Sequence, residues 1–447
     1  MEEAIKTYER VKNKITLRQI NTLAIPALFA GIAEPLLSIA DTAFVGHMDV
    51  LPKESLAAVG LVGVFLSMIV WILGQTRSAI STITSQYLGA NKLDEIKDLP
   101  AQSIFLLILI SFGIVALSYP FASSIFRLYN ASDVLLELSV KYFRIRIFGL
   151  PFTLFTFAIF GIFRGLQNTF YPMIIAITGA LLNVALDYIL IFGFYDILPL
   201  NIQGAAYASI FAQFTMALLA VIFLYKKTEI KLKLQFPFNK EMKNLVFMIL
   251  NLFIRTIALN AALYFGSSFA TKYGDDSIAA YTISVNIWFF FAFVVDGYAG
   301  AGNILSGRLF GAKAYDQLRI LGKRLFIFGI SIGSLLAILA FVFYYPIGKL
   351  FIDDSNVLQK FYAVFWIVLI MQPINGIAFI FDGIFKGLGY MKYLRNTLLI
   401  STFAGFIPSL LIADYFGLQL YGIWISFAVW MILRAGILLI KFKKSFA

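Results

Sequence analysis

The sequence predicts an all-α polytopic membrane protein, with twelve transmembrane helices in two six-helix bundles related by pseudo-two-fold symmetry along the membrane normal. Three observations lead to this prediction. The chain is 60% hydrophobic and 13% charged, whereas soluble domains carry roughly 25% charged residues. Apolar runs of roughly 18 residues or more, enough to cross a bilayer, recur along its whole length. The second half of the chain also repeats the first at a constant offset.

The apolar runs form two sets of six. They lie near 20–46, 56–88, 101–122, 134–163, 170–194 and 203–225, and then near 246–271, 278–307, 324–346, 357–385, 396–414 and 420–440. The runs at 56–88 and 278–307 exceed the thickness of a bilayer, so these helices should tilt or project into water. A polar, basic linker at 226–244 separates the two sets. The predicted bundles are therefore residues 1–225 and 245–447.

The internal repeat appears when the sequence is shifted by 222 residues. Several short segments then match: Leu56-Ala57-Ala58 with Ile278-Ala279-Ala280, Leu88-Gly89-Ala90 with Phe310-Gly311-Ala312, Pro151 with Pro373, and Gly161–Leu166 with Gly383–Leu388. Because six is an even number, both halves enter the membrane from the same side and form a parallel repeat. The glycine-containing matches predict close helix packing. Two such bundles can rock about a central site, which is the basis of alternating access.

Charge and composition exclude several classes of function. Most Lys and Arg lie in alternate loops, which places both termini and the linker in the cytoplasm of a cell's inner (plasma) membrane. The net charge of +12 forms no basic groove with stacking aromatics, so no nucleic-acid partner is expected. The chain has no cysteine, one histidine (His47) and no Walker-type Gly-Lys-Ser/Thr motif. We therefore expect neither an enzyme nor a bound cofactor.

Ionisable groups within apolar runs are the candidate functional residues, because each costs at least ~2.5–3.5 kcal/mol at bilayer depth. The first run holds Glu34 and Asp41, nearly two helical turns apart and hence on one face. The fifth run holds Asn183 and Asp187, one turn apart. If these helices face each other, three carboxyls and one amide converge. Close carboxyls cannot all ionise comfortably, so at least one should hold a proton near neutral pH.

A sodium ion is the alternative occupant of this cluster, because hard cations prefer oxygen ligands. Asp41, Asn183 and Asp187 would bind it, together with the Ser209 hydroxyl and the Ala205 backbone carbonyl. The sequence leaves H⁺ and Na⁺ open. It also leaves open a structural role, in which these groups only hydrogen-bond three helices together.

The first apolar run also contains a predicted hinge. Pro26 and Pro35 each remove one helical hydrogen bond, and Gly31 lies between them. We hypothesise that proton or ion binding at Asp41 changes the bend of this helix. A static kink is the alternative.

The second half does not duplicate the acidic cluster. At the 222-residue offset Asp41 matches Leu263 and Asp187 matches Ser409. The halves have therefore diverged, and proton or Na⁺ binding at such a cluster should reside in the first half.

Two other ionisable pairs are expected in the second half. Arg255 and Asp296 should form an intramembrane ion pair with a structural or gating role. Asp382 lies one turn before Lys386 and could pair with it.

Short motifs spread in order over the whole chain resemble the multidrug and toxic compound extrusion (MATE) family, in its DinF-like branch. The motifs are Glu34-Pro35, Asp41–His47, Tyr87–Ala90, Arg164-Gly165, Asn183-x-x-x-Asp187, Gly204–Ser209, Arg255, Asp296-Gly297 and Lys386-Gly387. The resemblance implies a cation-coupled antiporter that exports small amphipathic organic compounds in exchange for H⁺ or Na⁺. It also implies contact with membrane lipid, and we expect a monomer. The family commonly has an amide where this chain has Glu34.

Three other classes are weighed against this resemblance. A lipid-linked precursor flippase of the same superfamily would have more spans and a strongly cationic cavity, and the buried acids argue against it. A major-facilitator transporter would carry an Asp-Arg-rich loop after the second span, where this chain has Leu88–Lys92. A channel would let its solute cross the membrane without an ion gradient, and a receptor would move no solute.

Overall fold

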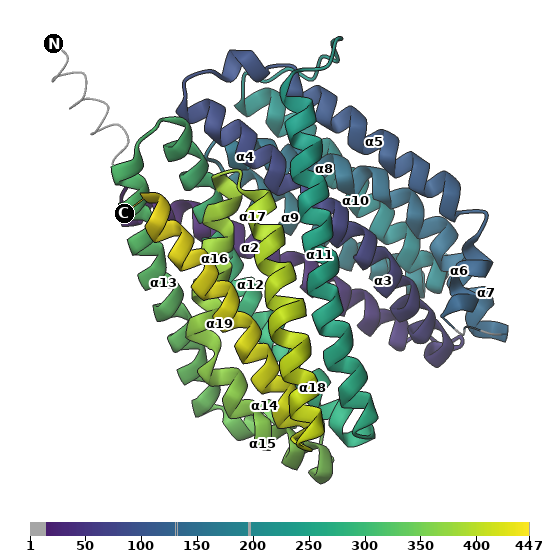
Figure 1. Cartoon of the computed structure of the whole chain (residues 1–447). Helices are drawn as coiled ribbons and strands as arrows, with labels where there is room; N and C mark the ends of the chain where they lie inside the picture. Colours follow the sequence, from purple (N-terminus) through teal and green to yellow (C-terminus); the bar gives the residue numbers. More distant parts are fainter. Residues whose placement is uncertain (1–14, 130, 132, 195–197, 447) are drawn as a thin grey trace, which may run out of the picture. The chain divides into compact units, whose positions relative to one another are not determined.

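The structure is a computed structural model that describes residues 15–129, 131, 133–194 and 198–446, with the side chains of 33–39 outside the description (Figure 1). Among the described residues, ten helices are long and apolar enough to cross a membrane. The pair α15 (Ser355–Ile370) and α16 (Gln372–Gly387), bent by 51°, is apolar enough only when taken together and gives an eleventh span when it is counted as one. The 30-residue helix α2 (Leu17–Gly46) precedes them in the chain.

The helices follow one another with short connections. Those of the first half are α2, α3 (Pro52–Gly74), α4 (Thr76–Gly89), η1 (Leu93–Ile96), α5 (Leu99–Ser118), α6 (Ala122–Leu128), α7 (Asp133–Arg146), η2 (Ile147–Gly149), α8 (Leu150–Gly165), α9 (Phe170–Phe192) and α10 (Ile202–Lys227). Those of the second half are α11 (Glu241–Lys272), α12 (Asp275–Gly311), α13 (Tyr315–Val342), α14 (Tyr344–Phe351), α15, α16, α17 (Met391–Ile400), the π-helical η3 (Ser401–Phe406), α18 (Ile407–Tyr415) and α19 (Gln419–Phe446).

The helix boundaries confirm the predicted repeat. Helices α6, α7 and α8 begin 222 residues before α14, α15 and α16, respectively. A short helix, a longer helix and a further helix beginning Leu-Pro or Gln-Pro thus occur in the same order in both halves. In each case the proline occupies the first turn, where its missing N–H costs no helical hydrogen bond.

Glycines repeat the same close helix packing in both halves, as predicted. A Cβ on Gly161 of α8 would lie 2.7 Å from the backbone oxygen of Arg77 in α4. At the 222-residue offset, a Cβ on Gly383 of α16 would overlap the backbone oxygen of Ala299 in α12. One turn further on, a Cβ on Gly165 would overlap the Thr84 side chain of α4, and a Cβ on Gly387 would overlap the backbone oxygen of Asn303 in α12. Only glycine lets these helix backbones come so close.

The described chain divides into two compact units. The C-terminal unit comprises the residues up to Leu28, Ser85–Asn91 and the residues from Leu250 onward. The N-terminal unit comprises Phe29–Thr84 and Lys92–Ile249. The predicted lobe boundaries at 225 and 245 stay a prediction.

The segment Ser85–Asn91 belongs to the C-terminal unit through a reciprocal backbone contact. A Cβ on Gly89 would overlap the backbone oxygen of Arg308, and a Cβ on Gly311 would overlap that of Gln86. Gln86 and Arg308 are themselves 222 residues apart, as are the two glycines. The two repeat-related segments therefore cross each other with equivalent positions in contact on both sides, which is the signature of a two-fold relation.

The basic linker between α10 and α11 is held to the N-terminal unit by one buried amide. The Nε2 of Gln102 in α5 donates to the backbone oxygen of Gln235 at 2.8 Å, and its Oε1 accepts from the backbone N–H of Asn239 at 2.8 Å. The Asn239 side chain in turn donates to the backbone oxygen of Glu95.

Candidate functional site

Helices α9 and α10 and the part of α2 from Phe29 onward, all in the N-terminal unit, bring four of the predicted polar residues together. Asp187 is fully buried on α9, with Asn183 one turn before it, and Ser209 is buried on α10. Helices α9 and α10 pack closely because Gly204, at the start of α10, lies against the backbone oxygen of Leu190. Asp41, in the last third of α2, faces this pair of helices.

The four side chains form one polar cluster, which we call the carboxyl pair site. The Nδ2 of Asn183 donates to Oδ2 of Asp187 at 2.9 Å. The Ser209 hydroxyl donates to Oδ2 of Asp41 at 3.4 Å. The Asp41 and Asp187 carboxyls are close enough to act electrostatically on each other. Asn183, Asp187 and Ser209, which were predicted to converge on Asp41, thus contact it or its partner.

One oxygen of each carboxyl has no hydrogen-bond donor next to it among the described residues. The Oδ1 atoms of Asp41 and Asp187 are buried and accept no hydrogen bond from the residues that the structure describes. An ionised carboxylate only accepts hydrogen bonds, so two ionised carboxylates in contact repel each other and cannot bond. A proton on one of them turns it into a donor to the other. The geometry therefore suits one shared proton or one small cation.

A basic side chain next to the pair was not predicted from the sequence. Arg146, the last residue of α7, acts electrostatically on both Asp41 and Asp187. Its Nη1 donates to Oε1 of Gln213 in α10 at 3.1 Å, and it also acts electrostatically on the buried Tyr142. The available signal was an arginine inside the apolar run 134–163, just before the Gly149–Pro151 break in the helix.

Gly149 keeps the Arg146–Gln213 bond in place, and this gives a testable prediction. A Cβ at Gly149 would overlap Oε1 of Gln213 and approach Nη1 of Arg146 to 3.0 Å. In Gly149→Ala the flexible Gln213 side chain should move aside, so we expect a several-fold lower transport rate with little loss of thermal stability. Gly113→Ala, where a Cβ meets nothing within 4 Å, should leave the transport rate unchanged and should not lower the thermal stability. Wild-type transport by Gly149→Ala would refute a role for this contact.

Other predicted site residues are placed as follows. Ala205 is buried within α10, where its carbonyl takes part in the helix. Pro26 lies inside α2, and a Cβ on Gly31 would meet nothing within 4 Å, so Gly31 makes no close helix contact. The side chains of Glu34 and Pro35 lie outside the described residues. The hinge and the role of Glu34 stay predictions.

No group of three or more His, Cys, Asp or Glu in the described part of the chain is placed to hold a metal ion. The Na⁺ ligands proposed from the sequence, Asp41, Asn183 and Asp187, supply two carboxyls and one amide.

In the C-terminal unit, Arg255 has a different partner from the predicted one. Its Nη2 bonds Oδ1 of Asp382 at 2.6 Å, whereas Asp296 lies exposed on α12. Asp382 also pairs with Lys386 at 3.1 Å, as its spacing predicts. The physical reason is simple: Asp382 is buried where several cations surround it, and buried charges persist only when paired. The sequence does not say which helices face α11.

This architecture is that of a polytopic membrane transporter: helical spans in two repeated halves, with a polar cluster inside one bundle. The chain belongs to the MatE family, whose model matches residues 26–189 and 251–411, one match in each half. The match excludes the major-facilitator alternative. Members of this family are transporters, not enzymes.

Relatives and solved structures agree over nearly the full length. The chain is 28% identical to Protein DETOXIFICATION 44, chloroplastic, of Arabidopsis thaliana, over 93% of this chain and 80% of that protein. It is 25% identical to DNA damage-inducible protein F of Escherichia coli, over 92% and 89%. A crystal structure described as MATE in the bent conformation superposes with a TM-score of 0.88 at 21% identity, covering 96% of this chain and 95% of the other.

Proposed function

We propose that this protein is a proton-coupled antiporter that exports amphipathic organic cations across a bacterial plasma membrane, with both termini in the cytoplasm. The observation that carries the proposal is that the carboxyls of Asp41 and Asp187 belong to one polar cluster with Asn183 and Ser209, in which one oxygen of each carboxyl is buried and accepts no hydrogen bond from the described residues. Relatives support the substrate class: the similar proteins of Thermotoga maritima and Pasteurella multocida are named probable multidrug resistance protein NorM.

The closeness of the two carboxyls favours H⁺ over Na⁺. Two neighbouring carboxyls that hold one proton can bond each other, whereas a sodium ion would require both to be ionised and to turn their oxygens toward the ion. The remaining polar partners, Asn183 and Ser209, each donate to an Oδ2 atom and leave the Oδ1 atoms available. The site thus offers one place for one proton.

Exchange follows from the charge of this site. With the proton bound, the pair carries one negative charge beside the guanidinium of Arg146, so the local charge is balanced. Loss of the proton leaves an excess negative charge that attracts an organic cation. Proton and substrate then compete for the negative charge of the carboxyl pair site. Binding of either one allows the site to change from one side of the membrane to the other, as alternating access requires.

The proposal is tested in vesicles that contain purified protein. We expect a pH gradient alone to drive uphill movement of a fluorescent aromatic cation, and a Na⁺ gradient alone to drive none. Flux in the absence of any gradient would indicate a channel, and scrambling of labelled lipid without cation transport would indicate a flippase. Transport driven by Na⁺ at equal internal and external pH would overturn the choice of H⁺.

A further inference from the structure

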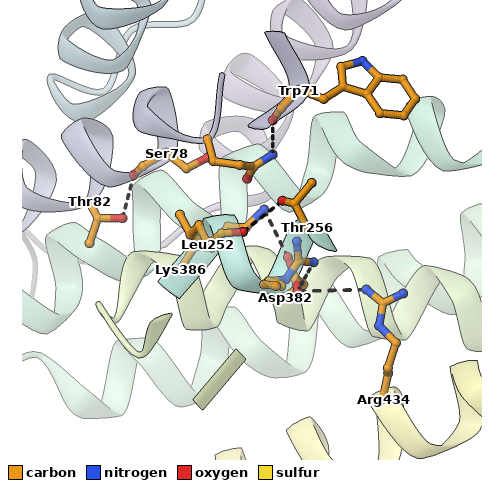
Figure 2. Close-up of polar contacts among 10 residues, drawn as sticks. Trp71, Ser78, Thr82, Leu252, Thr256, Asp382, Lys386 and Arg434 are labelled. Atoms are coloured by element: carbon orange, nitrogen blue, oxygen red, sulfur yellow. Dashed lines mark hydrogen bonds and ion pairs between the residues drawn. The ribbon is translucent and has the colours of Figure 1, made fainter. Parts of the chain in front are cut away.

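The C-terminal unit contains a buried cluster in which one acid faces three bases (Figure 2). Arg255 of α11 and Lys386 of α16 bond opposite oxygens of Asp382, at 2.6 and 3.1 Å. Arg434 of α19 approaches Oδ1 of Asp382 only to 4.0 Å. One carboxylate thus faces three cations, so the cluster carries an excess of two positive charges.

Of the three cations around Asp382, Arg434 is the one that forms no hydrogen bond with its carboxylate. Its side chain is 2% exposed, and 4.0 Å is too long for a hydrogen bond to Oδ1 of Asp382, which Arg255 already occupies. Its Nη1 donates to the sulfur of Met431, a weak acceptor, at 3.2 Å. Its Nη2 meets no hydrogen-bond acceptor among the residues that the structure describes, although Figure 2 shows the guanidinium directed toward Asp382.

Aromatic rings complete the surroundings of this guanidinium. Its carbon lies 4.8 Å from the centre of the Trp430 ring and 5.4 Å from that of Phe379. Ring faces attract a cation but accept no strong hydrogen bond, so they do not replace an anion. Moving a charged group from water into the protein interior costs free energy. Only a close, hydrogen-bonded group of opposite charge offsets that cost.

The cluster has no equivalent in the first half. At the 222-residue offset Asp382 matches Phe160 and Arg434 matches Ala212. The cluster is therefore separate from the carboxyl pair site and opposite to it in charge. Its ligand should be opposite in charge as well.

We propose that this basic cluster is an anion site, at which Arg434 holds a compact monovalent anion, either a halide or the carboxylate of a small organic acid, beside the Trp430 ring. The free Nη2 donor of Arg434 supplies a hydrogen bond, and the two excess charges supply attraction. Compactness follows from burial, since the donors lie among side chains that are packed closely around them. The anion lowers the net charge of the cluster and should stabilise this bundle.

The position of Trp430 provides a direct readout, because bromide quenches indole fluorescence on contact. Purified protein is titrated with bromide at constant ionic strength, with gluconate as the balancing anion. We expect a saturable component of quenching on top of linear collisional quenching, and chloride or formate should compete with the saturable component. The same anions should raise the melting temperature in a saturable manner, as binding to the folded state requires.

Three variants distinguish anion binding at this cluster from collisional quenching and from general effects of salt. Arg434→Met, similar in length and without charge, should lose both the saturable quenching and the thermal shift. Trp430→Phe should lose most of the saturable quenching but keep the thermal shift, which shows that the cluster still folds and binds. Trp366→Phe removes an exposed indole, 47% accessible, and should reduce only the linear component. Quenching that is linear throughout, or a thermal shift retained in Arg434→Met, would overturn the proposal.

Discussion

Replacing Asp187 by asparagine is expected to abolish uphill transport while leaving the fold intact. The substitution preserves shape, and the amide oxygen still accepts the 2.9 Å bond from Asn183. It removes the group that shares a proton with Asp41, so binding of substrate is no longer tied to release of a proton. Substrate should still equilibrate down its own gradient.

The size of the effect follows from the energy of the gradient. One pH unit corresponds to about 1.4 kcal/mol per proton, so one-for-one exchange with a monovalent cation supports about a tenfold substrate gradient. Vesicles with wild-type protein should approach that ratio, and those with Asp187→Asn should stay near equal concentrations. Asp49→Asn, an exposed residue after α2, is the matched control and should behave as wild type. A tenfold gradient sustained by Asp187→Asn would remove this residue from the coupling mechanism.

The second large effect is expected at the reciprocal crossing of Gly89 and Gly311. Alanine normally stabilises a helix relative to glycine by about 1 kcal/mol. Here a Cβ would overlap a backbone oxygen, which cannot rotate away as a side chain can. Gly89→Ala and Gly311→Ala should therefore each destabilise the protein instead of stabilising it. The expected loss in the free energy of unfolding is about 1–3 kcal/mol, as for other overpacked sites.

Thermal unfolding in detergent, together with the yield of monodisperse protein, measures this effect. Gly436→Ala in α19 is the matched control, because a Cβ there meets nothing within 4 Å. It should raise the melting temperature, whereas Gly89→Ala and Gly311→Ala should lower it. If the three variants shift in the same direction, the close crossing does not exist in the protein.

The elements of the fold are predictable because lipid imposes simple rules on the sequence. Apolar length reveals the spans, and a single offset reveals the repeat, which reappears in helices that begin at Ala122 and Tyr344. Helical spacing alone places Asn183 and Asp187 on one face. The meeting of Asp41 with them depends on the assumption that the first and fifth spans face each other, and the structure gives that contact.

Residues that depend on which helices are neighbours could not be predicted. Arg146 ends α7 within an apolar run, and nothing in its local sequence points toward Asp41. The sequence suggests Asp296 as the partner of Arg255 because both are charged and intramembrane, but pairing depends on which helix faces the arginine. The actual partner, Asp382, lies on α16, more than a hundred residues away. The spacing of residues in the sequence predicts which side chains share one face of a helix. It does not predict which other helix packs against that face.

The central claim, that Asp41 and Asp187 share a proton which substrate displaces, is tested most directly by proton release. Purified protein in weakly buffered detergent is mixed with an organic cation and a pH indicator. Facing carboxyls titrate as one coupled pair, so we predict release of about one proton for each cation bound by the wild type. The double variant Asp41→Asn/Asp187→Asn should release none. Binding without proton release from the wild type, or equal release from the double variant, would contradict the account.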